Sequence, residues 1–218
     1  MAARRLGRLN DEVVYVGGRS TALFITDPLS LDVRVTEDVD CIIDVVTLSS
    51  YYQFCEKLKV QGFIQRMEDD VVCRWRYDDL ILDVMPIKEE VLGFGNRWYG
   101  DALACAITHQ LSDDVSIKAI TAPYFLATKI EAFKGRGKGD FFGSHDIEDI
   151  VTVIAGRIEI VEDIVSENIT TRLYLKEFFQ EASSNYEFQQ ALPGHVNDGP
   201  MTSQRVRIVM DRIKKIIG

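Results

Sequence analysis

The chain has 218 residues, and no apolar run in it approaches the roughly 20 residues that a helix needs to cross a bilayer. Its first residues, Met1 to Arg5, are followed by mixed polar sequence and lack the apolar segment of a secretory signal peptide. Only four cysteines are present, and none has the CxxC spacing of a redox or zinc motif. We therefore expect a cytoplasmic protein with reduced, mostly buried thiols and no membrane partner.

Two common nucleotide-binding signatures are also absent. The sequence has no Gly-x₄-Gly-Lys-Ser/Thr P-loop and no Gly-x-Gly-x-x-Gly dinucleotide fingerprint. Any phosphate group that binds must therefore meet a different glycine turn, metal ions or isolated basic side chains.

The composition is that of a folded globular protein, with 46% hydrophobic and 27% charged residues. The net charge of -9 argues against a general nucleic-acid coat, because such binding depends on basic contacts to phosphate. The charge is uneven, however. Residues 1–114 carry 20 acids and 12 bases, whereas residues 115–218 carry 14 acids and 13 bases. Two basic islands lie at 118–138 and 205–218, and use of an RNA substrate predicts that they line one groove.

Runs of β-branched and aromatic residues dominate the first part of the chain, and helical patterns dominate the second. Strands are expected at 13–16, 39–46, 63–64, 71–75, 80–85, 102–108 and 115–120, with a hairpin turn at Tyr77-Asp78-Asp79. Helices are expected at 20–25, 49–60, 121–133, 144–154, 158–166, 168–181 and 202–217. Tyr52, Cys55 and Leu58 are spaced for one face of the helix at 49–60, and Ser144 can cap the helix at 144–154. The basic residues of the last helix form either a solvated face or a contact for RNA or a partner. The pattern predicts an α+β fold, with a mixed sheet and flanking helices over residues 1–114 and a C-terminal helical bundle over residues 115–218.

The first chemical feature is Val16-Gly17-Gly18-Arg19-Ser20, where a strand runs through two glycines into a helix. Glycines at such a turn let a phosphate approach the backbone, and amides at the start of a helix can bind it. The alternative interpretation is an ordinary tight turn.

The second feature is Asp38-Val39-Asp40 at the head of a strand. Alternate strand residues share a face, so the two carboxylates point the same way while Val39 and Cys41 point toward a core. Two neighbouring carboxylates repel each other, and Mg²⁺ is a cation that prefers their oxygens. The alternative is a solvated acidic edge.

The third feature is Asp83, a single charge inside the apolar strand Leu80 to Pro86. An unpaired carboxylate in that setting is costly, so Asp83 lies at an exposed strand end, has an arginine partner or shares a cation site. A glycine turn, a strand with two aspartates and a later strand with one aspartate together favour two-metal phosphoryl transfer, in which Asp83 is a shared ligand or general base.

The order of these features resembles the nucleotidyltransferase superfamily of the DNA polymerase β type, and more narrowly its AbiEii/AbiGii toxin branch, which includes the MenT toxins. The resemblance covers roughly residues 13–155, with a loop insertion at 27–30. It rests on Gly17-Gly18, Arg34-x-Thr36-x-Asp38-x-Asp40, Asp83, Thr128 to Lys134 and His145 to Ile150.

The resemblance implies an Mg²⁺-dependent enzyme that transfers NMP from an NTP to an acceptor hydroxyl. It implies that the triphosphate is cradled by Gly17, Gly18 and Ser20, that Mg²⁺ is held by Asp38, Asp40 and Asp83, that Lys129 contacts phosphate, and that Asp146 orients the lysine or the nucleotide. It further implies an RNA acceptor, with a tRNA 3′ end as the expected one, and a toxin–antitoxin or phage-defence setting with an antitoxin partner.

Several of these residues have simpler interpretations. Lys129 is equally well explained as a surface lysine at the edge of an amphipathic helix, and the helix dipole accounts for Asp146 and Asp149 in a first turn. Arg34 either clamps a phosphate or pairs with Asp38, and we favour the pairing.

Two other functions are consistent with the sequence. One is a small-molecule nucleotidyltransferase of the antibiotic-modifying kind, and the other is a non-catalytic member that binds NTP or a protein partner. Retention of all three aspartates argues against the second of these.

Overall fold

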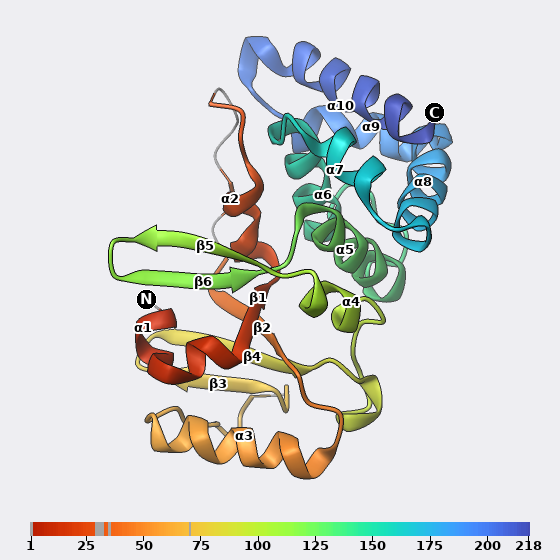
Figure 1. The fold of residues 1–218 in the computed structure, drawn as a ribbon. Helices are drawn as coiled ribbons and strands as arrows, with labels where there is room; N and C mark the ends of the chain where they lie inside the picture. Colours follow the sequence, from red (N-terminus) through yellow and green to blue (C-terminus); the bar gives the residue numbers. More distant parts are fainter. Residues whose placement is uncertain (1, 29–32, 35, 70) are drawn as a thin grey trace. The chain divides into compact units, whose positions relative to one another are not determined.

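The computed structural model describes residues 2–28, 33–34, 36–69 and 71–218. The chain folds into two compact units (Figure 1). The sheet unit comprises Met1–Ser20 and Val35–Thr121, and the helical unit comprises Thr21–Arg34 and Ala122–Gly218. The sheet unit is therefore interrupted in sequence by Thr21–Arg34, which is assigned to the helical unit.

The sheet unit is built on one six-stranded sheet in the order β3-β4-β2-β1-β6-β5. Its strands are β1 (Val13–Val16), β2 (Asp38–Ile43), β3 (Arg74–Tyr77), β4 (Leu80–Pro86), β5 (Ile107–Ser112) and β6 (Val115–Ala119). The sheet is mixed, since β2 pairs with β4 in parallel and β1 with β6 in parallel, while the other neighbours are antiparallel. The predicted mixed sheet is therefore confirmed.

The central strands are buried because β1 and the end of β2 are continuous runs of β-branched and other apolar residues. The helical and 3-10 elements of this unit are α1 (Ala2–Leu6), η1 (Gly7–Glu12), η2 (Gly18–Ser20), α3 (Leu48–Val60), η3 (Glu89–Val91) and α4 (Tyr99–Ala104). Helix α3 begins at the N-cap Thr47, whose side chain accepts a hydrogen bond from the Ser50 amide. The helix packs on the sheet through Tyr51, whose hydroxyl donates to the Val84 carbonyl at 3.1 Å.

Some expectations for this unit are wrong. The segment 102–108, expected to be a strand, begins in helix α4, and the strand starts only at Ile107. Ala102 and Ala104 favour helix, and local β-propensity was a weak guide there. Tyr52, expected on one face of α3 with Cys55 and Leu58, is 59% exposed, whereas those two residues and Tyr51 are buried.

The helical unit contains α2 (Thr21–Phe24), α5 (Ala122–Arg136), α6 (His145–Gly156), α7 (Ile160–Ser166), α8 (Ile169–Ser184), α9 (Tyr186–His195), η4 (Gly199–Met201) and α10 (Thr202–Ile217). Its core is formed by apolar faces of α5, α6, α8 and α10, including Phe125, Ile150, Leu175 and Ile213. The predicted α+β fold with a C-terminal helical region is confirmed.

Helix α9 was not expected, because Pro193-Gly194 favours a loop. The helix nevertheless extends through Pro193 to His195. A proline in the last turn removes few backbone hydrogen bonds, and Asn185 caps the other end by accepting from the Glu187 and Phe188 amides.

The two units differ from the predicted division of the chain. The predicted boundary at 114/115 falls in the turn between β5 and β6, and both strands belong to the sheet unit. The loop insertion expected at 27–30 lies partly outside the described residues, because residues 29 and 30 are not described.

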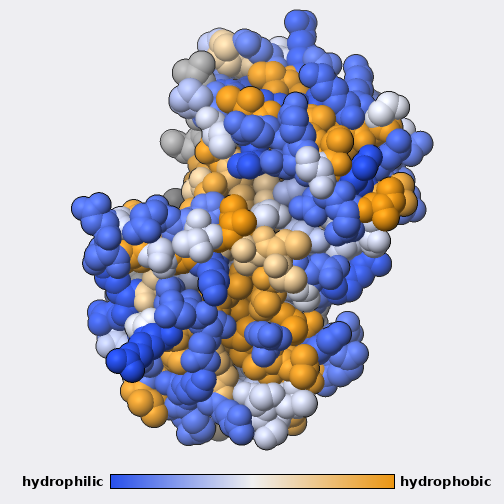
Figure 2. All heavy atoms as spheres, in the orientation of Figure 1, coloured by the Kyte–Doolittle hydropathy of each residue, from blue (hydrophilic) through white to orange (hydrophobic). Residues whose placement is uncertain are grey.

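Hydrophilic side chains are distributed over the surface of both units on the face shown in Figure 2. Within the part of the chain that the structure describes, no helix combines the length and the apolar composition needed to cross a membrane.

Candidate metal centre and buried ion-pair cluster

Three aspartates meet in the sheet unit, as the sequence predicts. Asp38 and Asp40 lie on β2, and Asp83 lies on the neighbouring parallel strand β4. The register places Asp40 directly beside Asp83 and places Asp38 beside Ile81. Each aspartate offers one carboxylate oxygen to a group in which all three atoms lie within 4.8 Å of one another. This aspartate triad is the candidate metal centre.

The three aspartates of the triad differ in their exposure to solvent. Asp83 is buried, at 7% of its accessible surface, whereas Asp38 and Asp40 are partly exposed. Their neighbours Val39 and Cys41 are buried, which confirms the predicted alternation at the start of β2. Three carboxylates this close repel one another, so the group needs positive charge nearby.

Arg74 of β3 supplies positive charge to the triad. Its Nε donates to Asp83 Oδ1 at 2.8 Å and its Nη2 donates to Asp83 Oδ2 at 2.7 Å. The same Nη2 lies 3.6 Å from Asp38 Oδ2. The hydrogen bonds to Asp83 and the charge of Asp38 raise the pKa of Arg74 above its ordinary value. Of the alternatives for Asp83, an arginine partner is the one observed, and it coexists with the triad geometry.

Gly17 gives the Asp40 side chain its space. Gly17 has a φ of +71°, and a Cβ at this position would lie 1.9 Å from Asp40 Oδ2. Because Val16 pairs with Asp40 across β1 and β2, the turn at Gly17 begins directly beside the carboxylate. Gly17 is therefore more than a tight turn, since any side chain here would displace a triad member.

The other two residues of the predicted phosphate cradle follow in the 3-10 turn η2. Gly18 and Ser20 are both buried. The Ser20 hydroxyl donates to the Val16 carbonyl at 2.9 Å, and the Ser20 amide donates to the Gly17 carbonyl at 3.1 Å. Ser20 thus closes the turn through its own backbone and side chain.

The buried thiols near the triad are electrostatically held in the neutral form. Burial, followed by the charges of Asp40 and Asp83, raises the pKa of Cys41 well above its usual range. Burial and the charge of Asp83 raise the pKa of Cys73 to about 12. Neither thiol is therefore a thiolate ligand at neutral pH.

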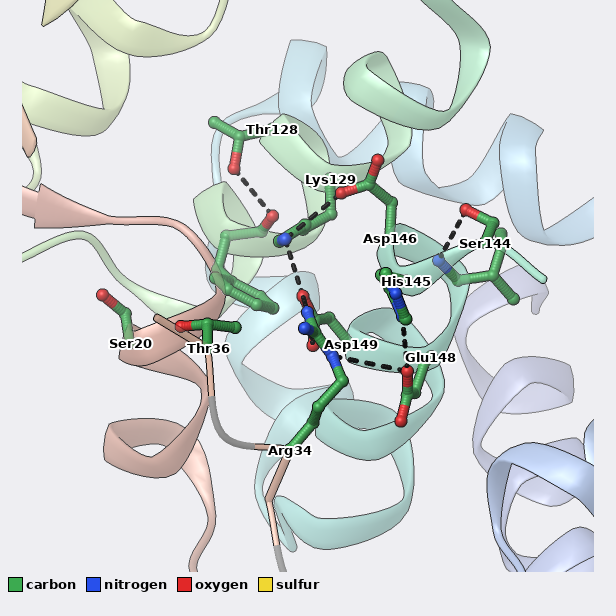
Figure 3. Close-up of polar contacts among 12 residues, drawn as sticks. Ser20, Arg34, Thr36, Thr128, Lys129, Ser144, His145, Asp146, Glu148 and Asp149 are labelled. Atoms are coloured by element: carbon green, nitrogen blue, oxygen red, sulfur yellow. Dashed lines mark hydrogen bonds and ion pairs between the residues drawn. The ribbon is translucent and has the colours of Figure 1, made fainter. Parts of the chain in front are cut away.

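A separate set of charges lies in the helical unit (Figure 3). Lys129 of α5 is only 8% exposed, and its Nζ lies 2.6 Å from Asp149 Oδ2 and 3.2 Å from Asp146 Oδ1, both on α6. The interpretation of Lys129 as a surface lysine is therefore wrong. The ammonium is held between two buried carboxylates, which offset the cost of burying it.

Two arginines extend this ion-pair cluster from its buried centre toward the surface, where the Arg136 side chain is 73% exposed and that of Arg34 is 25% exposed. Arg136 forms a bidentate contact with Asp146, with both hydrogen bonds at 2.9 Å. Arg34 lies 3.4 Å from Asp149 and 3.4 Å from Glu148, so the expected pairing of Arg34 with Asp38 is replaced by pairing within the helical unit. The cluster is balanced in charge, because its three cations face three carboxylates.

Asp146 is ionised in this setting. Burial opposes its charge, but the Arg136 hydrogen bond and the charges of Lys129 and Arg136 outweigh burial and lower the pKa of Asp146. Ser144 caps α6 as predicted by accepting from the Ile147 amide, and this places Asp146 in the first helical turn. The helix dipole adds to the stabilisation there.

Sequence reasoning missed Arg74, Arg136 and Asp149 as partners of the predicted site residues. Arg74 and Asp83 are brought together by the β3–β4 pairing, in which Arg74 lies opposite Asp83. The predicted hairpin turn at 77–79 already indicates this pairing, because a register counted outward from Asp78-Asp79 places Arg74 opposite Asp83.

Two of the five bases in the terminal basic island are used inside the helical unit. Arg205 is buried and lies 2.7 Å from Asp27, and Arg212 donates to the carbonyls of Ile154 and Ala155 at the end of α6. Arg207, Lys214 and Lys215 are exposed. A solvated face therefore describes only part of this helix.

No protein-family model matches the chain, and no curated protein matches it. Among solved structures, the crystal structure of JHP933 from Helicobacter pylori is similar, with a TM-score of 0.48 and 12% identity over 98% of this chain and 88% of that chain. A likeness at this level carries no argument about function, which has to be argued from the site.

Proposed function

We propose that the protein is an Mg²⁺-dependent nucleotidyltransferase that transfers NMP from an NTP to an acceptor hydroxyl. The observation that carries the proposal is the convergence of Asp38, Asp40 and Asp83 within 4.8 Å on two adjacent strands. The glycine turn beside Asp40 and the resemblance in motif order support it.

The triad fits the metal. Its donors are carboxylate oxygens alone, which suit a hard divalent cation such as Mg²⁺ and do not suit a thiophilic metal. Asp38 and Asp40 are partly exposed, so a cation and its waters can reach them. When bound, Mg²⁺ would neutralise the phosphate charge and lower the pKa of the attacking hydroxyl.

The protein's own groups divide the remaining work. Asp38 and Asp40 would hold the cation, and the lack of a side chain at Gly17 leaves the space that the Asp40 carboxylate occupies. Both Asp83 oxygens already accept hydrogen bonds from Arg74. This favours Asp83 as a charge that positions the cation rather than as the proton acceptor.

The roles of Lys129 and Asp146 stay predictions. Lys129 has two carboxylate partners within the helical unit and Asp146 is bound by Arg136. A phosphate that binds Lys129 would have to share it with these carboxylates. The proposal for the triad does not depend on this residue.

We propose an RNA 3′ end as the acceptor, following the resemblance. The test incubates the purified chain with Mg²⁺, each labelled NTP in turn and total RNA. Asp40→Asn is expected to reduce label transfer by at least about a hundredfold, because it removes a metal ligand. The matched control is Asp44→Asn, an exposed aspartate that follows the same strand, and it is expected to transfer at the wild-type rate.

Absence of transfer to any RNA, or transfer that Asp40→Asn leaves unchanged, would contradict the proposal. Label that appears on a small hydroxylated compound instead of RNA would keep the nucleotidyltransferase and replace its acceptor.

A further inference from the structure

The arginine at the triad is positioned in a way that the proposed catalysis does not explain. Arg74 is the guanidinium that contacts two of the three aspartates, at 2.7 and 2.8 Å from Asp83 and 3.6 Å from Asp38. Its side chain is 23% exposed, so much of its charge is shielded from water and directed at the carboxylates.

We propose that Arg74 is the internal counter-cation of the aspartate triad and that it lowers the affinity of the triad for free divalent metal. The inference rests on the proposed function only in treating the triad as a metal site. Arg74 is thus a positioning residue that acts on the metal through Asp83 and Asp38.

The charges of the triad make a counter-cation necessary. Three ionised carboxylates within 4.8 Å of one another destabilise the folded protein unless a cation is near. Arg74 provides one such charge at all times, because a guanidinium does not lose its proton in proteins. The sheet unit therefore does not depend on a metal to compensate the buried Asp83.

Arg74 and a metal can occupy the triad together. A carboxylate has about four lone-pair sites, and the bidentate arginine uses two of those on Asp83. The two remaining lone-pair sites on Asp83 can therefore join the group of oxygens, one from each aspartate, that lie within 4.8 Å of one another. What Arg74 imposes is repulsion between its own charge and the divalent ion a few ångströms away.

The same strand provides a matched comparison. Arg76 of β3 is also 23% exposed and also forms a bidentate pair, with Asp69, at 2.6 and 2.9 Å. It differs in that Asp69 is not part of the triad. Loss of Arg76 removes an equivalent ion pair from the same strand, and Arg76 acts on the triad only through a weaker charge interaction with Asp83.

The experiment measures the binding of Mn²⁺ alone, as a probe for Mg²⁺, to the full chain by the EPR signal of the free ion. Arg74→Gln is expected to bind Mn²⁺ at least about fivefold more tightly than the wild type, because a unit charge near a divalent ion is removed. Arg76→Gln is expected to bind within about twofold of the wild type, because Arg76 makes its hydrogen bonds to Asp69 and interacts only weakly with Asp83. Arg74→Lys keeps the positive charge, so its affinity for Mn²⁺ should stay close to that of the wild type.

Equal or weaker binding by Arg74→Gln would overturn the inference, as would an absence of Mn²⁺ binding in both this variant and the wild type. If Arg74→Gln does not fold, Arg74→Met replaces it, with the same expectation. The outcome is separable from that of the transfer assay. A fivefold difference in Mn²⁺ binding without label transfer would support the inference about Arg74 and contradict the proposed enzyme. Label transfer without that difference would support the enzyme and contradict the inference.

Discussion

At the scale of single residues, the candidate metal centre depends on a side chain that is missing. Gly17 has a positive φ, and the space where its Cβ would stand is filled by the carboxylate of Asp40. The glycine therefore serves the backbone turn and the position of a triad oxygen at once. These two roles can be separated by comparing Gly17 with a glycine that has only the first.

Gly17→Ala is expected to lower the free energy of unfolding by about 2–4 kcal/mol, since it adds a clash to a left-handed backbone. It is also expected to abolish Mn²⁺ binding, because Asp40 has to move. Urea unfolding measures the first effect, and the EPR signal of free Mn²⁺ measures the second.

Gly93→Ala is the control for this substitution. Gly93 lies in the same unit at a φ of +79°, and a Cβ there meets no atom within 4 Å. The variant should lose about 1–2 kcal/mol through backbone strain alone and keep its metal binding. Equal metal binding by Gly17→Ala and Gly93→Ala would show that the Asp40 contact does not matter.

At the scale of elements, the sequence was informative wherever the pattern was local. Strand β1, the Gly17 turn and the Ser144 cap of α6 were all predicted, because strand propensity, a glycine pair and a capping serine act over a few residues. The strand prediction for 102–108 is wrong because it also relied on local preference, and this segment contains both helix-favouring and strand-favouring residues.

The partners of the site residues depend on contacts between elements, and these were harder to predict. Arg74 reaches Asp83 through the β3–β4 register, which the hairpin turn determines. Asp149 and Arg34 are 115 residues apart in sequence and meet only in the folded helical unit. No local pattern indicates that pairing, so the sequence favoured an ion pair between Arg34 and Asp38 instead.

The α5–α6 pair provides a prediction about pH. The folded-state pKa of Asp146 is lowered from 3.8, chiefly by the Arg136 hydrogen bond and the charges of Lys129 and Arg136 acting against burial. A lowered pKa gives stability that is present above the unfolded value and is lost as the pH falls through the lower, folded value. Asp146→Asn should therefore lower the free energy of unfolding by about 1.5–3 kcal/mol at pH 7. The loss should become progressively smaller as the pH falls below the pKa of the carboxyl in the unfolded chain.

Urea unfolding of the wild type and Asp146→Asn between pH 7 and pH 3 measures this difference. Asp211→Asn is the control, because Asp211 is 69% exposed in its side chain and its partner Lys214 lies 3.9 Å away. An exposed pair of this kind contributes about 0–1 kcal/mol. A cost for Asp146→Asn that stays constant across the pH range would contradict the assignment of its charge to the cluster.

At the scale of the whole molecule, the excess of acids in residues 1–114 now has a structural context. The triad lies in that part, and Arg74 compensates it from within the same unit. The second half, although nearly neutral, uses Arg205, Arg212 and Arg136 for internal contacts. Counting bases along the chain therefore overstates the positive surface available to RNA, because the sequence does not distinguish paired from exposed arginines.

The four thiols test the packing of the sheet unit as a whole. Cys41, Cys55 and Cys73 are buried and Cys105 is exposed, and all four are free thiols. Burial raises the pKa of Cys55 to about 11 and that of Cys73 to about 12, and it raises the pKa of Cys41 well above its usual range. The thiolate is the nucleophile that attacks a disulfide reagent, so lack of access and lack of ionisation both protect these three thiols.

In the native protein, one thiol per chain is expected to react rapidly with a chromogenic disulfide reagent, and all four are expected to react in denaturant. Cys105→Ser should remove the rapid phase and leave the denatured count one lower. Slow reaction of the other three then reports opening of the sheet unit, because each must leave its packed site before it can ionise. Two or more rapid thiols in the native wild type would mean that the sheet unit does not close around all three of Cys41, Cys55 and Cys73.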